Sequence, residues 1–219
     1  MKLVDFSAVI FDMDGLVLDT EATYCFAKQE AAKSMGFAVS DDFWLSLSGL
    51  HASDIEQKLF DHLGADFDCS AFNGRAEQIW HAYVKNNGIQ IKPGFFALLN
   101  FIVEQALPFC LATNSNAVNA TNCLKLARLQ DIFPVVITRD DVLQGKPEPD
   151  IFLKAADRLG VEIKQCLALE DSPTGIQAAT RAGAFSVFVP SVLPVDPLAL
   201  SLCDVMLPDL EQVLQNLRA

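Results

Sequence analysis

The chain has 219 residues, of which 51% are hydrophobic and 20% are charged, so we expect a sizeable buried core rather than a disordered chain. The formal net charge of −12 argues against a nucleic-acid partner or an anionic membrane surface, because both need a basic stripe. No apolar run reaches the roughly 18 residues of a membrane span, and the six cysteines form no C-x-x-C pair. We expect a cytoplasmic protein with free thiols.

Short apolar runs predict the strands of a buried sheet. In chain order they are Ala8–Phe11, Phe109–Ala112, Val135–Ile137, Cys166–Leu169 and Ser186–Val189, with a short edge strand at Asp204–Leu207. Helical patterns lie between the later strands, at Gly94–Gln105, Asn116–Leu126, Asp150–Leu159 and Gly175–Ala182. This alternation predicts an α/β fold, a Rossmann-like parallel sheet flanked by helices on both faces.

The interval after the first strand departs from this alternation. Only helical patterns fill it, at Glu21–Met35, Asp41–Leu47, Ser53–Leu63 and Ala71–Asn87. We interpret residues 18–90 as an inserted helical cap domain. Residues 1–17 and 91–219 then form a discontinuous α/β core domain.

Carboxylates follow two of the predicted strands. Asp12 and Asp14 come directly after the first strand, and because they are two residues apart on extended chain, we expect both to face one pocket. Their mutual repulsion needs compensation, and a Mg²⁺ ion, which prefers oxygen ligands, would supply it. Asp171 is the favoured further ligand, with Glu170 as a second ligand or an outer partner. Alternatively, Asp171 or Ser172 merely caps the helix led by Pro173.

Two other segments favour an anionic ligand. Thr113, Asn114 and Ser115 offer hydroxyls and backbone N–H groups where a helix begins, which is a natural anion site, although an ordinary helix cap would have the same residues. Lys146 stands between Gly145 and Pro147 and could offset phosphate charge, although a solvated lysine in a surface turn is the commoner arrangement. Together with the carboxylates, these residues predict phosphoryl-transfer chemistry.

The same segments, in this order, resemble the haloacid dehalogenase (HAD) superfamily. "FDMDGLVLDTE", "GKPEPDIF" and "LEDSPTGIQAATRAG" are most similar to its sugar-phosphatase and β-phosphoglucomutase-like branch, and the resemblance runs from Val9 to about Val189. It implies that Asp12 is the nucleophile and that Asp14 is the general acid and base. It also implies that Asp12, the Asp14 backbone carbonyl and Asp171 hold Mg²⁺. Thr113, Asn114 and Lys146 would bind the phosphoryl group.

Two departures from the mutase pattern favour hydrolysis. Tyr24 stands where these mutases place a histidine, and Ala52 stands where they place an arginine for the substrate's second phosphate. Gly49 and His51, beside the second departure, are candidate substrate-binding residues. We therefore expect a Mg²⁺-dependent phosphatase for small phosphate monoesters such as sugar or polyol phosphates. It would act as a monomer or small homo-oligomer.

Three other functions stay open at this point. A phosphomutase would isomerise a hexose 1-phosphate instead of releasing phosphate. A non-catalytic HAD-fold protein would bind a phosphorylated metabolite without turnover, since a fold alone does not define a function. A dehalogenase would release halide without metal, but the second aspartate, Asp14, points to phosphoryl chemistry.

Overall fold

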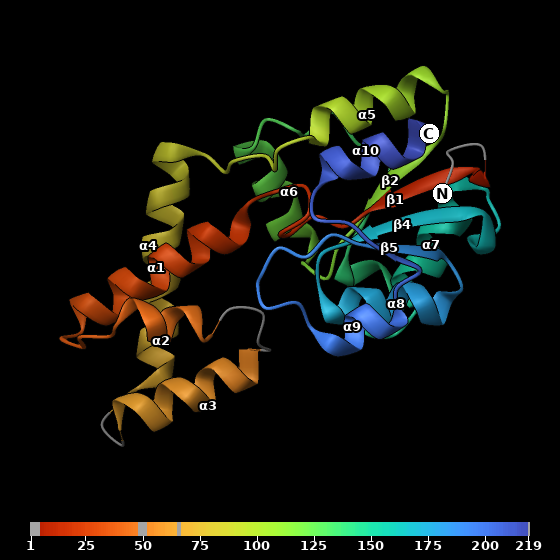
Figure 1. The fold of residues 1–219 in the computed structure, drawn as a ribbon. Helices are drawn as coiled ribbons and strands as arrows, with labels where there is room; N and C mark the ends of the chain where they lie inside the picture. The colour runs from red at the N-terminus through yellow and green to blue at the C-terminus, as the bar shows by residue number, and fades with distance from the viewer. Residues whose placement is uncertain (1–4, 48–51, 65–66, 219) are drawn as a thin grey trace. The chain divides into compact units, whose positions relative to one another are not determined.

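The computed structural model describes residues 5–47, 52–64 and 67–218. The chain divides into two compact units (Figure 1). One unit combines Met1–Asp19 with Gln90–Ala219, and the other is Thr20–Ile89. We call the first the sheet unit and the second the helical unit, and each is described by itself.

The sheet unit is built on six parallel strands. The order across the sheet is β3-β2-β1-β4-β5-β6, and every neighbouring pair is parallel. The strands are β1 (Ala8–Phe11), β2 (Phe109–Ala112), β3 (Val136–Ile137), β4 (Cys166–Glu170), β5 (Phe185–Phe188) and β6 (Val205–Met206). The predicted parallel sheet is confirmed, and no predicted strand end differs from the observed one by more than one residue.

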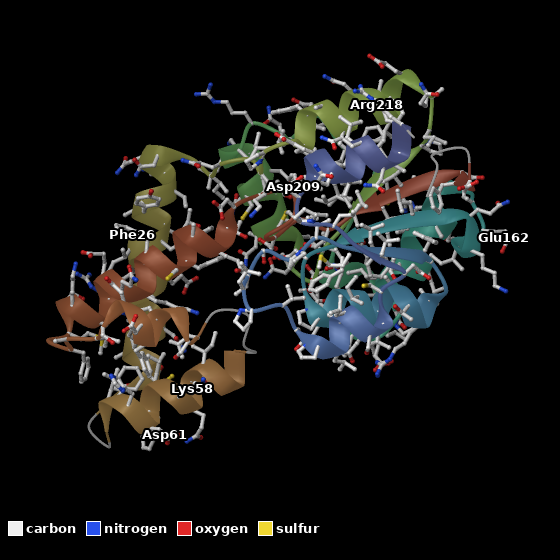
Figure 2. The ribbon with its side chains drawn as sticks, viewed as in Figure 1. Phe26, Lys58, Asp61, Glu162, Asp209 and Arg218 are labelled. Carbon is white, nitrogen blue, oxygen red and sulfur yellow. The ribbon has the colours of Figure 1, made fainter. Side chains whose placement is uncertain are left out.

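Helices cover both faces of the sheet, as the alternating pattern predicted (Figure 1). In the figure α5 and α10 lie on one face and α7 and α8 on the other. The α-helices of this unit are α5 (Phe95–Glu104), α6 (Ala117–Leu126), α7 (Asp150–Leu159), α8 (Pro173–Ala182), α9 (Pro197–Leu202) and α10 (Leu210–Arg218), and two short 3₁₀ helices are η2 (Arg139–Asp141) and η3 (Ile163–Gln165). The Arg218 guanidinium lies 5.1 Å from the centre of the Phe101 ring and joins α10 to α5 (Figure 2).

The alternating side chains of β1 divide between the two faces of the sheet. Ile10 packs with Phe152 of α7 in one buried cluster. Phe11, the next residue, meets Phe95 of α5 edge-on, with ring centres 5.8 Å apart. Both positions are fully buried. A strand that is apolar on both faces is typical of the centre of a parallel sheet. Because β1 is buried on both faces, its carboxyl end is held at one edge of the sheet.

The helical unit contains α1 (Thr20–Ser34), α2 (Asp41–Leu45), α3 (Ala52–Leu63) and α4 (Cys69–Asn87). The Trp80 indole N–H of α4 donates a 2.9 Å hydrogen bond to the Thr23 hydroxyl of α1. Apolar side chains form its core: Ala31, Ala32, Trp44, Leu47, Leu59, Phe67, Phe72 and Ala76. None of the helices that the structure describes is long and apolar enough to cross a membrane.

Candidate active site

The predicted carboxylates meet at the carboxyl edge of the sheet. Asp12 follows β1, while Glu170 ends β4 and Asp171 follows it, and these two strands are neighbours. One carboxylate oxygen from each of the three residues lies within 4.8 Å of the other two, and all three side chains are buried. Burying three carboxylates together is costly unless cations compensate them. This cluster is the candidate active site.

Lys146 supplies one cation to the cluster. Its ammonium group donates hydrogen bonds to Asp12 Oδ1 and Glu170 Oε1, and a third, 2.9 Å long, to the carbonyl of Ala112 at the end of β2. The residue is only 8% exposed. Lys146 is therefore part of the buried site and does not occupy a solvated surface turn.

The charges at the site shift two pKa values in the same direction. Burial, with a second contribution from the Glu170 charge, raises the pKa of Asp12 well above its ordinary value, and Lys146 opposes that rise. Burial alone would lower the pKa of Lys146, but the charges of Asp12 and Glu170 outweigh it and raise this pKa. Asp171 adds a third buried carboxylate to the group that contains Asp12 and Glu170. A site of this kind favours a further cation.

Asp14 is held by the segment that follows β2. Its Oδ2 accepts a 2.9 Å hydrogen bond from the Ser115 hydroxyl and a 3.3 Å bond from the Thr113 hydroxyl. The Thr113 oxygen in turn accepts a 3.0 Å bond from the Ser115 backbone N–H. The sequence placed Ser115 in a candidate anion site but did not predict its contact with Asp14. The spacing of two residues between the hydroxyls is the signal that could have indicated it, because both reach one carboxylate oxygen.

Asn114 makes its side-chain contacts with the backbone of Lys146. The Lys146 N–H donates a 2.8 Å hydrogen bond to Asn114 Oδ1, and Asn114 Nδ2 donates a 3.0 Å bond to the Lys146 carbonyl. The structure therefore brings Asn114 to the site. Its predicted contact with a phosphoryl group stays a prediction.

Glu170 lies between Lys146 and the first turn of α8. Its Oε2 is 3.2 Å from the Asp171 N–H, 3.4 Å from the Ser172 N–H and 3.2 Å from the Ser172 hydroxyl, and it accepts from all three. Donors at a helix N-terminus stabilise a carboxylate. Both oxygens of Glu170 thus have protein partners, which favours the outer role that the sequence left open for it.

Two glycines allow the carboxylates to pack so closely. A Cβ on Gly15, which has a φ of +82°, would lie 1.9 Å from Asp171 Oδ2. A Cβ on Gly175 would lie 1.9 Å from Glu170 Oε2 and 1.9 Å from its Cδ. Atoms cannot approach that closely, so only glycine fits at these two positions.

The other residues that the sequence singled out belong to the interval predicted as a cap. Gly49 and His51 lie outside the described residues. Tyr24, on α1 of the helical unit, stacks on Trp80 with ring centres 4.7 Å apart and an angle of 6°. The carboxylate cluster therefore consists of residues of the sheet unit.

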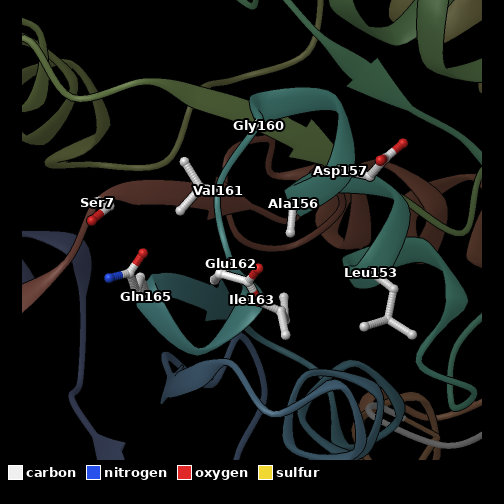
Figure 3. Close-up of a pocket in the computed structure, with 9 residues that line it drawn as sticks. All are labelled: Ser7, Leu153, Ala156, Asp157, Gly160, Val161, Glu162, Ile163 and Gln165. Carbon is white, nitrogen blue, oxygen red and sulfur yellow. The ribbon is translucent and has the colours of Figure 1, made fainter.

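A shallow depression of about 660 Å³ lies at the opposite edge of the sheet (Figure 3). Ser7, directly before β1, and Gln165, directly before β4, line it together with residues of α7 and the loop after α7. Because the acidic cluster follows the carboxyl ends of the same strands, the depression is separate from the candidate site. It contains none of the predicted site residues.

The fold and this cluster define a class. The chain is an α/β protein with a polar, acidic site at the carboxyl edge of a parallel sheet, where such sheets bind their ligands. More particularly, the chain belongs to the haloacid dehalogenase-like hydrolase family, whose model matches residues 9–189. This confirms the resemblance that the motifs indicated.

Individual relatives agree with this family. Over 189 residues the chain is 33% identical to a Drosophila melanogaster protein named "Probable pseudouridine-5'-phosphatase", covering 83% of this chain and 80% of that one. It is 31% identical to the fructose-1-phosphate phosphatase YqaB of Escherichia coli, covering 84% and 96%. The β-phosphoglucomutase structure from Clostridium difficile is similar with a TM-score of 0.69 and 25% identity, covering 95% of this chain and 93% of that one.

Proposed function

We propose that the protein is a Mg²⁺-dependent phosphatase that hydrolyses small phosphate monoesters, most suitably sugar or polyol phosphates, through an aspartyl-phosphate intermediate. The observation on which this depends is the contact of Lys146 with both Asp12 and Glu170 inside a buried group of carboxylates. A positive side chain at that place offsets the charge that a phosphoryl group would bring to an anionic nucleophile.

The donor set fits a magnesium ion. The candidate ligands are the carboxylates of Asp12 and Asp171 and the backbone carbonyl of Asp14, all of them hard oxygen donors. Glu170 is the weaker candidate, because Lys146 and the first turn of α8 occupy its oxygens. When bound, the ion would neutralise the carboxylates and polarise the phosphoryl oxygens.

Asp12 and Asp14 divide the chemistry between them. An Asp12 oxygen attacks phosphorus, the ester P–O bond breaks, and Asp14 protonates the departing alkoxide. In the second step Asp14 takes a proton from water, which attacks the same phosphorus and releases inorganic phosphate, so that Asp12 is regenerated. The hydroxyls of Thr113 and Ser115 hold the Asp14 carboxylate at a fixed position, which favours repeated proton transfer by one oxygen.

The relatives, together with the two departures from the mutase pattern, support the proposed substrate class. The names of two relatives state pseudouridine 5'-phosphate and fructose 1-phosphate as their substrates. Both compounds are monoesters of a polyhydroxylated carbon skeleton. We infer that this chain acts on the same class.

A phosphomutase is the second candidate, and the similarity to a β-phosphoglucomutase structure is what favours it. Tyr24, in place of the mutase histidine, and Ala52, in place of the mutase arginine, argue for hydrolysis. Incubation with a hexose 1-phosphate and a bisphosphate primer distinguishes the two. Free phosphate indicates the phosphatase, and the isomeric hexose phosphate indicates the mutase.

The nucleophile gives the direct test. Asp12→Asn should reduce the turnover of p-nitrophenyl phosphate with Mg²⁺ by at least roughly 10³-fold, because an amide cannot form the aspartyl-phosphate. Asp157→Asn, a change of an exposed aspartate on α7, is the matched control and should keep wild-type turnover. Retained turnover in a folded Asp12→Asn protein would show that another residue is the nucleophile.

A further inference from the structure

Arg139 joins two segments that the proposed reaction uses. It is the first residue of η2, directly after β3 and Thr138. Its backbone N–H donates a 3.0 Å hydrogen bond to the carbonyl of Ser115, the residue that holds Asp14. Its guanidinium donates to the carbonyls of Val142 at 2.9 Å and Leu143 at 3.1 Å. These carbonyls belong to residues 142–148, which we call the Lys146 loop.

Gly145 is enclosed between Arg139 and Asn114. A Cβ on Gly145 would lie 2.6 Å from Arg139 Cδ, 2.9 Å from Arg139 Nε and 2.4 Å from Asn114 Oδ1. The stem of Arg139 therefore packs directly against the backbone of Gly145. The Asn114 amide, which lies against the same position, pairs with both backbone groups of Lys146. The backbone before Lys146 is thus fixed by two side chains that come from other parts of the chain.

Side-chain contacts hold the Lys146 loop, and those of Arg139 are at its start. At its other end Arg181 donates to the Pro147 carbonyl at 3.0 Å and pairs with the Glu148 carboxylate at 2.8 Å, and the Gln144 N–H donates to Asp150 at 3.2 Å. The described residues 142–148 form no helix or strand, and the side chain of Leu143 is 91% exposed. No acidic partner of Arg139 occurs in an ion pair among the described residues, so its guanidinium acts here as a donor to backbone carbonyls. A planar group with several fixed donors suits two successive carbonyls better than an ammonium does.

We propose that Arg139 is a positioning residue for Lys146, and this rests on the proposed function in which Lys146 offsets charge at the reacting phosphoryl group. Arg139 fixes the backbone of residues 142–145. The lysine side chain then needs to lose only its own rotamer freedom to place Nζ between Asp12 and Glu170. Without Arg139, two loop carbonyls lose their partners and Gly145 loses one of its walls.

Hydrogen exchange tests the positioning without any assay of activity. The loop amides of Lys146 and Glu148 are hydrogen-bonded, to Asn114 Oδ1 at 2.8 Å and to the Gly145 carbonyl at 2.9 Å. In Arg139→Met we expect these amides to exchange about tenfold faster, with unchanged exchange in β1 and β4. Arg158→Met, the loss of an exposed arginine on α7, is the control and should leave the loop unchanged. Unchanged loop exchange in Arg139→Met would overturn the proposal.

Kinetics test whether the positioning acts through Lys146. With p-nitrophenyl phosphate and Mg²⁺ we expect Arg139→Met to lower kcat about tenfold and to change KM by less than about threefold, because charge at the reacting centre is affected more than ester binding. In a Lys146→Met background the same substitution should lower kcat little further, because the two changes remove one contribution. Full additivity, or an unchanged kcat despite faster loop exchange, would overturn the proposal.

The two proposals fail in different ways. If Lys146→Met alone retains wild-type turnover, the proposed role of Lys146 is wrong, while loop exchange still reports whether Arg139 fixes the loop. If Arg139→Met does not fold, Arg139→Lys retains the charge and one donor. That variant should give a smaller rise in exchange and a smaller loss of kcat, and wild-type values for both would contradict the proposal.

Discussion

The position of the Glu170 carboxylate depends on the absence of a side chain at Gly175. Its carboxylate is fully buried and is bonded by Lys146 on one side and by the start of α8 on the other. Gly175, in the first turn of α8, leaves the space that this carboxylate fills, since a Cβ there would meet Glu170 at 1.9 Å. The backbone of α8 and the position of Lys146 are thereby linked through one acidic side chain.

Gly175→Ala should therefore destabilise the protein by about 1–3 kcal/mol, the usual cost of inserting atoms into a packed interior. Gly74→Ala is the matched control, because Gly74 lies within α4 and a Cβ there would meet no atom within 4 Å. The control should stabilise by about 0.5–1 kcal/mol through helix propensity. Urea unfolding followed by far-UV circular dichroism measures both. A Gly175→Ala protein as stable as wild type would mean that Glu170 can move without cost.

At the scale of an element, the Asp141 side chain caps the start of η2. The Asp141 Oδ2 accepts a 2.8 Å hydrogen bond from the Thr138 N–H and a 2.7 Å bond from its hydroxyl. The backbone bond first, and then the hydroxyl bond, lower the pKa of Asp141 below its ordinary value. The cap therefore stabilises the start of the segment that leads from Arg139 into the Lys146 loop.

This depressed pKa gives the cap a defined pH dependence. A carboxyl with a lower pKa in the folded state adds stability above its unfolded pKa, near 3.9, and loses that stability as the pH falls through its folded pKa. Asp141→Asn should cost about 0.5–1 kcal/mol at pH 7, because the Asp141 side chain is exposed to solvent. The difference from wild type should shrink toward pH 3. Urea unfolding of both proteins between pH 7 and pH 3 measures it, and a difference that stays constant would contradict the assigned cause.

The elements themselves were largely predictable, because their signals are local. The run Ala8–Phe11 is apolar at every position and is buried at every position, and the helical patterns between strands became α5 to α8. The carboxylates after β1 and β4 were predictable for the same reason. Parallel strands bring their carboxyl ends to one edge of the sheet, and the ends of the apolar runs predict where the strands end.

The partners of the loop side chains were not predictable. Asn114 pairs with Lys146, which lies 32 positions further along the chain, and the Lys146 ammonium reaches Glu170, 24 positions away. A local pattern gives the type of an element but not which loops meet after folding. Arg139 stands in a short polar segment that resembles any surface turn, so only its contacts in the folded chain distinguish it.

At the scale of the whole molecule, a divalent cation should raise the stability of an acidic protein that has a buried acidic cluster. The chain has a net charge of −12, and Asp12, Glu170 and Asp171 lie together, with Lys146 paired to the first two. A cation that binds only the folded state stabilises it by mass action, by about 2.7 kcal/mol at a concentration 100 times its Kd.

We therefore expect saturating Mg²⁺ to raise the melting temperature by about 5–10 °C, since about 1 kcal/mol corresponds to about 2–4 °C for a chain of this length. Asp171→Asn should lose most of this rise, because it removes a proposed ligand, while the Asp157→Asn control should keep it. Sodium chloride at matched ionic strength separates binding from the screening of the net charge. Thermal unfolding followed by circular dichroism, with and without EDTA, measures the effect. An equal rise in Asp171→Asn, or with sodium chloride alone, would show that general screening rather than the acidic cluster is responsible.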